Sequence, residues 1–512
     1  MKKLPVLLIA ALLCAFSTSS YASQPNTLFV ALGDEPVKGF DSVLGWGKYG
    51  NPLIQSTLLK YNKNFELQGD LAISWQLSED KLSWSIKIRS DILFSDLSSL
   101  TAEDVAFTFL QAKRTLSAHD LSNLKDVVVL SPTYLRFDLK KPDITFIDHF
   151  VSIGIVPKHA YSKNYAQYPI GSGPYQFVQW KKGQSVTLRV NPNYYAKKPA
   201  FNELVIVFGS ESSRFALFKT GQLHLTTLPQ KFVSSLPKES KLWSINSVDN
   251  RGIVWPMHST KEGNKESAIS SDIAIRQAVD LAIDRSVIIQ QLLNGYAHPA
   301  YSVADGLPWG PMTPSEHHYD VKRAQQTLTS AGWIDSNNDG IRERNSINAE
   351  MTLYYKAGDS VREELAITIS QMLKPIGIKL DIVGADWDTI AKHMHNNPVL
   401  MGFGSHSANE IRSLFHSDYA GVDFYNSGLY QNEEVDHLID QAIHASSWQE
   451  SLPLWQESQK LIEKDLPWTW LVNLDHLYAT NKCLDLGSPL TEPHAHGWPL
   501  VSNIAEWRWV CQ

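Results

Sequence analysis

The chain has 512 residues and a formal net charge of −7, from 46 lysines and arginines against 53 aspartates and glutamates. This acidic balance, with no basic cluster, argues against binding to nucleic acid. Hydrophobic residues make up 43% of the chain, as in globular proteins, and its length exceeds one ordinary core, so we expect two or three domains.

Residues 1–22 have the composition of a cleavable signal peptide. Two lysines precede the apolar run 4–16, and the segment ends in the small-residue sequence SYA at 20–22. The apolar run is too short to cross a bilayer core of about 30 Å. The leucine directly before Cys14 does not fit a lipid-attachment site. We therefore expect export to the periplasm, with cleavage after Ala22.

Strand and helix patterns alternate along the rest of the chain. Residues 82–89 carry apolar side chains at every second position, which predicts a half-buried strand. Thr101 and Asp104 predict a capped helix start, because the threonine side chain can bond the amide three residues on. Further strands are predicted at 134–139, 186–190 and 204–208, and helices at 105–114, 271–284, 284–294, 320–331, 433–445 and 451–465. These patterns indicate an α/β protein of several domains.

Two of the three cysteines remain after the leader is removed. Cys483 and Cys511 both lie near the C-terminus, whereas Cys14 leaves with the signal peptide. In an oxidising compartment two leftover cysteines usually pair. We therefore predict a disulfide between Cys483 and Cys511 that ties down the C-terminal tail. Two free buried thiols are the alternative.

Several ordered segments resemble one family of transport proteins. They are GDLAISW (69–75), TAEDVAFTF (101–109), GSGPY (171–175), NPNYY (191–195) and IRQAVDLAIDR (275–285). These segments are similar to motifs of the peptide/nickel family of ABC-transporter solute-binding proteins. The matches run in the family's order from about residue 27 to about residue 480 of this chain.

The resemblance implies a two-lobed periplasmic binding protein fold that closes over a small molecule and presents it to an inner-membrane ABC permease. Lobe I is expected to be discontinuous, with an extra subdomain. The expected segments are 23–60, 170–258 and 478–512 for lobe I, 61–169 for the subdomain, and 259–477 for lobe II. The resemblance also implies a monomer that is not an enzyme and uses no catalytic cofactor.

Departures from the common pattern bear on the cargo. Peptide-binding members carry an acidic residue in lobe II that pairs with the α-amino group of the peptide, but the corresponding segment here is GSH at 404–406. A neutral imidazole cannot replace that charge, which argues against ordinary peptides. Together with GWGKYG (45–50) and EPHAHGWP (492–499), this segment resembles the nickel-chelate-binding branch of the family.

The nickel branch implies a set of candidate contacts. Nickel(II) accepts imidazole nitrogen readily, and two histidines spaced by one residue point the same way in an extended segment. We therefore expect a nickel complex with a small chelator such as histidine to be the transported ligand. Candidate metal contacts are His494, His496 and His406; candidate ligand contacts are Trp46, Tyr49, His258, His406 and Trp498. Each histidine has a satisfied core position as its alternative, and Trp46 and Tyr49 could equally belong to the core.

Other functions stay open at this level. Within the family, the cargo could instead be a peptide, an opine or haem. A secreted zinc hydrolase would need three ligands and a glutamate base at defined spacing, and no His-Glu-x-x-His motif occurs in the sequence. A ligand sensor or folding helper without a transport role would have the same sequence features.

Overall fold

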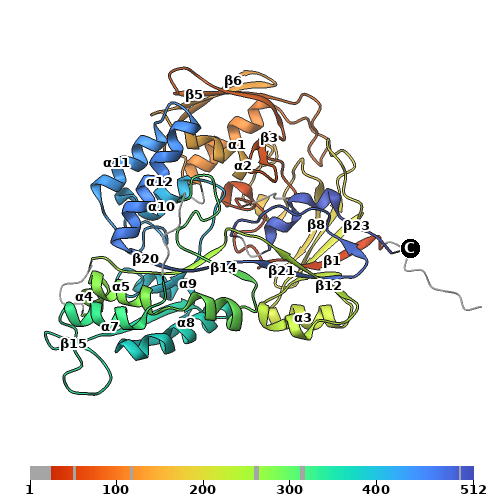
Figure 1. Ribbon diagram of the computed structural model, residues 1–512. Helices are drawn as coiled ribbons and strands as arrows, with labels where there is room; N and C mark the ends of the chain where they lie inside the picture. The colour runs from red at the N-terminus through yellow and green to blue at the C-terminus, as the bar shows by residue number, and fades with distance from the viewer. Residues whose placement is uncertain are drawn as a thin grey trace, which may run out of the picture.

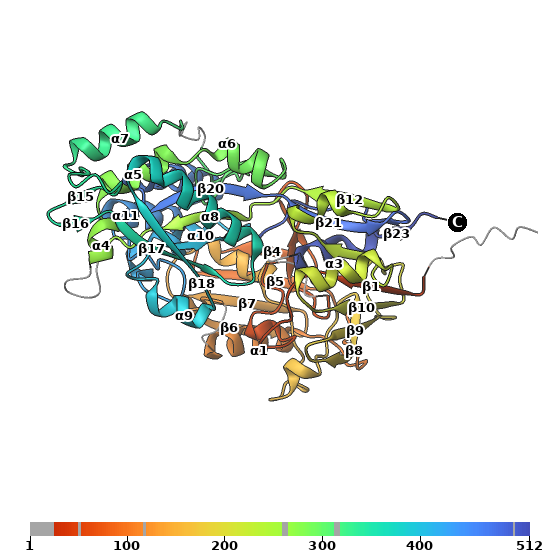
Figure 2. The same ribbon diagram turned by 90° about the horizontal axis from the view of Figure 1, so that it is seen from below.

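The computed structural model describes residues 25–49, 53–115, 119–258, 265–311, 318–494 and 497–511. Most strands belong to three sheets of seven, six and four strands, and helices pack against them (Figures 1 and 2). This arrangement confirms the predicted mixed α/β class. The expected leader 1–22 lies outside the described residues.

Within the described ranges, no helix is long and apolar enough to cross a membrane.

The seven-stranded sheet collects strands from distant parts of the chain. At its middle, β1 (Thr27–Ala31) runs parallel to β10 (Glu203–Val207) on one side and to β11 (Leu225–Thr227) on the other. The remaining strands pair antiparallel; they are β8 (Tyr175–Lys181), β9 (Ser185–Val190), β12 (Ser240–Ile245) and β21 (His476–Asn481). The helix α3 (Glu211–Lys219) packs against this sheet through Phe215 and Phe218. The beginning, middle and end of the chain therefore share one sheet.

A four-stranded antiparallel sheet forms a separate layer at the top of Figure 1. Its order is β4-β5-β7-β6, with bounds Ala72–Leu77, Ser83–Ile88, Tyr134–Leu139 and Leu124–Ser131. The strand predicted at 82–89 is β5, and its alternating residues Trp84, Ile86 and Ile88 are buried in one core with Phe109 of α1 (Ala102–Thr115). The hairpin β2 (Leu59–Tyr61) and β3 (Leu67–Gly69) and the short helix α2 (His149–Ser152) complete this part.

At the start of α1 the side chain that caps is Asp104, not Thr101 as predicted. The Asp104 carboxylate accepts hydrogen bonds from the backbone N–H of Thr101 at 2.9 Å and from its hydroxyl at 3.1 Å. The aspartate thus reaches back to the residue before the helix, which satisfies an amide there and places a negative charge at the positive end of the helix.

The six-stranded sheet has the order β14-β20-β13-β19-β17-β18. Its strands are, in that order, Ala297–Pro299, Trp468–Leu474, Asn250–Val254, Val399–Met401, Glu350–Lys356 and Lys379–Ala385. The associated helices are α4 (Lys265–Ser270), α5 (Ile273–Ala282), α6 (Arg285–Val287), α7 (Val321–Ser330), α8 (Ser360–Leu373), α9 (Trp387–His393), α10 (Asn409–Phe415), α11 (Glu433–Ile443) and α12 (Trp448–Asp465). Two short pairs, β15 (Glu343–Arg344) with β16 (Ile347–Asn348) and β22 (Leu484–Asp485) with β23 (Arg508–Trp509), lie outside the large sheets.

Two of the predicted helices differ in detail from the structure. Helix α5 begins at Ile273 rather than at 271, because the Asp272 side chain accepts the N–H of Ala274 as an N-cap. The helix predicted at 284–294 is a short α-turn, α6, that widens into a π-helix over Ile288–Leu292.

Two short connections join the seven-stranded and six-stranded sheets. Residues 246–249 lead from β12 to β13, and the single residue Asp475 separates β20 from β21. In Figure 1, β20 and β21 follow each other from the left part of the molecule to the right part. The boundary between the two large sheets is therefore a narrow crossing of two chain segments.

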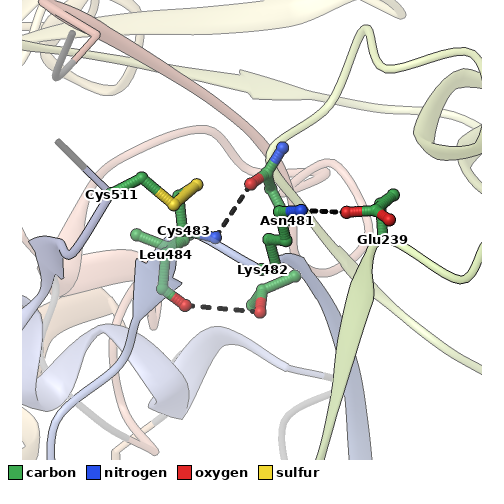
Figure 3. The surroundings of a disulfide bond; sticks show 7 residues. Glu239, Asn481, Lys482, Cys483, Leu484 and Cys511 are labelled. Carbon is green, nitrogen blue, oxygen red and sulfur yellow. Dashed lines mark hydrogen bonds and ion pairs between the residues drawn. A yellow bond between two sulfur atoms is a disulfide. The ribbon is translucent and has the colours of Figure 1, made fainter. Parts of the chain in front are cut away.

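The predicted disulfide is present. Cys483 and Cys511 are bonded, with their Cα atoms 5.0 Å apart (Figure 3). The pairing of β22 with β23 brings the two cysteines together, and the Cys483 N–H donates to the Asn481 side-chain oxygen at 2.9 Å. The bond closes the C-terminal segment onto the seven-stranded sheet, as predicted from the cysteine count.

Candidate functional site

The main cavity lies where the three sheet regions meet. It has a volume of about 370 Å³, and its walls come from the β2–β3 and α2 region, from residues 405–413 after β19, and from the C-terminal segments 490–493 and 499–505. A second hollow beside Arg285 and Trp470 holds only about 20 Å³, which is room for a water molecule. The larger cavity is therefore the candidate site for a small molecule.

One wall is a loop held in shape by a carboxylate. Gly404 has φ +139°, and a Cβ at that position would lie 2.2 Å from the carbonyl oxygen of Val248. Glu410, which lines the cavity, accepts hydrogen bonds from the N–H groups of Gly404 at 3.3 Å and of Ser405 at 2.8 Å. Burial raises the pKa of Glu410 to about 7 against the opposing effect of these two bonds.

His406 lies on the same loop, in an apolar environment. Its ring centroid is 4.8 Å from that of Phe65 and 6.1 Å from that of Tyr61, both roughly edge-on. Its Nε2 is buried and has no hydrogen-bond partner among the described residues. Burial lowers the pKa of His406 to about 4, so the imidazole is neutral at pH 7 and retains a lone pair that could bind a metal or a donor group.

Direct hydrogen bonds join the two sides of the cavity. Asp148 accepts from the Tyr61 hydroxyl at 2.9 Å and from the Ser407 hydroxyl, which comes from the loop after β19. Burial raises the pKa of Asp148 to about 6. A second bond also joins the two sides, because the Tyr419 hydroxyl donates to Asp120 at 2.5 Å. The cavity is therefore enclosed by contacts between the four-stranded and six-stranded sheet regions.

A buried ionic network occupies the crossing between the two large sheets. Asp249 pairs with Arg251 and accepts hydrogen bonds from His476 Nε2 at 3.0 Å and from His494 Nδ1 at 2.5 Å. His476 Nδ1 lies 2.6 Å from a carboxylate oxygen of Glu492. Glu492 also accepts from the Tyr478 hydroxyl at 2.5 Å.

The charges within this network follow from burial and pairing. Burial would raise the pKa of Asp249, but Arg251 and His494 hold it well below its usual value. Burial would likewise lower the pKa of His476, yet bonds to Asp249 and Glu492 raise it to about 9. Burial keeps the pKa of His494 below its usual value even though Asp249 opposes this. At pH 7 the carboxylate is ionised, His476 is charged and His494 is neutral.

This charge state fixes the tautomer of His494. Because an ionised carboxylate can only accept hydrogen bonds, His494 Nδ1 carries the proton and Nε2 is the unprotonated nitrogen, the form that ligates metals. The His494 N–H also donates to the Gly404 carbonyl at 2.7 Å, and its ring centroid is 6.2 Å from that of Tyr49, which lines the cavity. Tyr49 and His406 line the cavity, whereas His494 is not among its described lining residues and lies next to the wall, in contact with Tyr49 and Gly404.

The other predicted residues lie elsewhere. Trp46 and Trp498 pack edge-to-face with centroids 4.8 Å apart, and Trp46 also contacts Phe40 at 4.9 Å. Neither tryptophan belongs to the described residues that line the cavity. His258 is exposed and also lies outside that lining. His496 lies outside the residues that the structure describes.

Glu410 and Asp148 are the site residues that sequence reasoning missed. The absence of an acid at position 406 argued against ordinary peptides, but Glu410 supplies a carboxylate four residues later in the cavity wall. Its place in the first turn of α10, after the GSH segment, was the available signal. Over the described part of the chain, no three His, Cys, Asp or Glu side chains come together as a metal site.

Comparisons with known proteins agree on the type of molecule. A family model described as bacterial extracellular solute-binding proteins, family 5, matches residues 66–416. Protein XP55 of Streptomyces lividans is 29% identical over 90% of this chain and 83% of its own length. The oligopeptide-binding protein AppA of Bacillus subtilis is 25% identical over 99% of this chain and 98% of its own length.

A solved structure resembles the whole molecule. The crystal structure of NikZ from Campylobacter jejuni in complex with Ni(L-His) matches with a TM-score of 0.84 and 26% sequence identity. The match covers 94% of this chain and 99% of that chain. The fold expected from the sequence motifs is thereby confirmed over nearly the full length.

Proposed function

Because the chain belongs to the bacterial extracellular solute-binding proteins of family 5, we propose that it captures a nickel–chelator complex, such as nickel with histidine, in the cavity described above. Members of this family are substrate-binding components of ABC importers, not enzymes. In the proposal, the protein works in the periplasm, is exported by residues 1–22, and delivers its cargo to an inner-membrane permease as a monomer.

The observation that carries the nickel assignment is the chemistry of His494 together with the likeness to NikZ. Asp249 holds His494 in the tautomer whose Nε2 can ligate a metal. NikZ binds Ni(L-His) in a fold that superposes closely on this one. In the proposal, His494 is the principal protein ligand, and His406 or His496 supplies a second contact.

The remaining predicted residues take supporting roles in this proposal. Tyr49 forms an aromatic wall beside His494. Trp46, three residues before Tyr49, packs with Trp498 and would brace the segment that carries Tyr49. For His258 the exposed position supports no more than an entrance contact.

The division into lobes also stays a proposal. Lobe I would comprise 23–60, 170–258 and 478–512, with the subdomain 61–169 and lobe II at 259–477. Since β13 is part of the six-stranded sheet, we propose that the second segment of lobe I ends with β12 rather than at residue 258.

An oligopeptide is the second candidate cargo. An opine or haem are further alternatives within the same protein family. The likeness to AppA over nearly the full length favours a peptide, as do the carboxylates of Glu410 and Asp148 in the cavity. A peptide ammonium needs such an anion when it is buried.

Isothermal titration calorimetry separates the two cargoes. The protein without its leader is titrated with nickel plus L-histidine, with nickel alone, and with trialanine. We expect binding of the nickel–histidine mixture that is weakened by His494→Ala and unchanged by His437→Ala, an exposed histidine on α11. Binding of trialanine with no heat from nickel and histidine would overturn the nickel assignment.

A further inference from the structure

Beyond the nickel assignment, we propose that Glu410 is the counter-charge for a positively charged group of the cargo and so sets the charge preference of the cavity. The inference deepens the proposed function, because it concerns the same cavity. The positive group could be the metal centre of a chelate or an ammonium group, since a carboxylate attracts both.

The carboxylate is fixed in the cavity wall before any cargo arrives. Two backbone N–H groups, from Gly404 and Ser405, bond its two oxygens and set its orientation. The loop can take this shape only with glycine at 404, because of the positive φ and the close Val248 carbonyl. A group positioned this firmly needs little rearrangement when a ligand binds.

The carboxylate lacks a paired cation in the described structure. Among the described residues, no lysine, arginine or histidine nitrogen forms an ion pair with Glu410; Lys48 acts on it only at longer range. The Lys48 ammonium instead lies 4.6 Å from the ring centroid of Tyr49. A buried carboxylate without a cation is costly.

The other groups that face Glu410 do not neutralise it. Tyr49 and Tyr425 carry hydroxyls whose pKa values are raised by burial first and by Glu410 among other charges, and Asp249 is a like charge. Burial raises the pKa of Glu410 itself to about 7, so a proton competes for the place that a cation would take. A cationic cargo group would take the place of that proton and stabilise the ionised carboxylate.

The substitution Glu410→Gln separates this role from a purely structural one. Glutamine keeps the volume and removes the charge; its one oxygen can accept from one of the two N–H groups, while its NH2 faces the other. The variant should fold with a slightly lowered melting temperature, because one N–H group loses its acceptor. Glu410→Asp keeps the charge on a shorter side chain and serves if the glutamine variant is unstable. Glu433→Gln, at an exposed position on α11, is the matched control.

Calorimetry with three probes tests the proposal: nickel plus L-histidine, trialanine, and N-acetyl-trialanine, which lacks the ammonium. For the cationic probe that the wild type binds, we expect E410Q to lower the affinity by about tenfold or more. Glu433→Gln should change nothing, and E410D should retain most of the affinity. Any binding of the acetylated peptide should be equal in E410Q and the wild type.

The outcomes distinguish this proposal from the nickel assignment. Equal binding of nickel–histidine by the wild type and E410Q overturns the role of Glu410 and leaves the cargo standing. Binding of trialanine alone, lost in E410Q, overturns the nickel cargo and leaves the role of Glu410 standing. Mass spectrometry of molecules carried through purification adds a readout that needs no chosen probe. If the wild type binds no probe and carries no cationic molecule, both proposals fail.

Discussion

The surroundings of His406 and of His494 differ, although the sequence predicted the same metal-binding role for both. His406 packs edge-on against Phe65 with a buried Nε2 that has no partner in the described part of the chain. His494 is fixed by Asp249 within a network of buried charges. Burial lowers the pKa of both rings. The contrast teaches that equal protonation states can arise with very different rigidity, and only His494 has an orienting anion.

The largest effect is expected from Asp249→Asn. The substitution keeps the volume but removes the anion shared by Arg251, His476 and His494. Leaving buried cations unpaired should lower the free energy of unfolding by about 3–5 kcal/mol. Chemical denaturation followed by tryptophan fluorescence measures this. A loss near that of the exposed control Glu433→Gln would show that the network is not what holds the His494 region.

Alanine at each histidine should affect cargo affinity unequally. On the nickel proposal, His494→Ala should weaken nickel–histidine binding by about 100-fold and His406→Ala by about tenfold. The reason is that a ligand held in place binds better than one whose ring is positioned only by packing. Titration calorimetry at pH 7 gives both values. Equal losses would remove the distinction between the two sites.

The metal-free protein should lose stability at opposite ends of the pH range in the two regions. The pKa of His476 is raised to about 9, so its contribution is full below the unfolded value of about 6.5 and is lost as the pH rises toward 9. The pKa of His406 is lowered to about 4, so its contribution is full above about 6.5 and is lost as the pH falls toward 4.

Two variants isolate these contributions, each on the order of 2 kcal/mol. His476→Gln should flatten the alkaline decline in the free energy of unfolding, and His406→Phe should flatten the acid decline. Denaturation curves at a series of pH values report both. Unchanged pH profiles in both variants would contradict the charge states assigned to the two histidines.

The smallest effect is expected on the His406 side of the cavity. Tyr61→Phe removes the hydroxyl that donates to Asp148 at 2.9 Å, while the ring that packs against His406 remains. The free energy of unfolding should fall by about 1 kcal/mol. Tyr319→Phe, at an exposed position, should change it by less. A larger loss would mean that this bond also holds Asp148 in place for its contact with Ser407.

Local patterns predicted the elements well, and distant contacts account for what they missed. Alternating apolar residues identified β5 and β7 because one face of each strand is buried. The disulfide followed from there being two candidate cysteines. The π-helix after α6 departs from the period that predicted a regular helix.

The candidate site depended on contacts that no local pattern contains. The pairing of His494 with Asp249 spans 245 positions, and the bond from Ser407 to Asp148 spans 259. The histidines could be suspected from the resemblance, but their partners could not. Glu410 was within reach, because it follows the GSH segment by four residues in the first turn of α10, yet its bond to Ser405 depends on the fold of the loop before that helix.

The single residue between β20 and β21 limits how the two large sheets can move. Consecutive Cα atoms are fixed 3.8 Å apart, so the sheets cannot slide or separate at this point and can only pivot about it. Displacement should then grow with distance from Asp475. On the proposed division into lobes, spectroscopic labels far from the crossing, for example at Lys81 and Ser446, whose side chains touch at 2.9 Å in this structure, would report large changes. Labels beside Asp475 would stay nearly still. The motion could then be described by the angle between the two sheets.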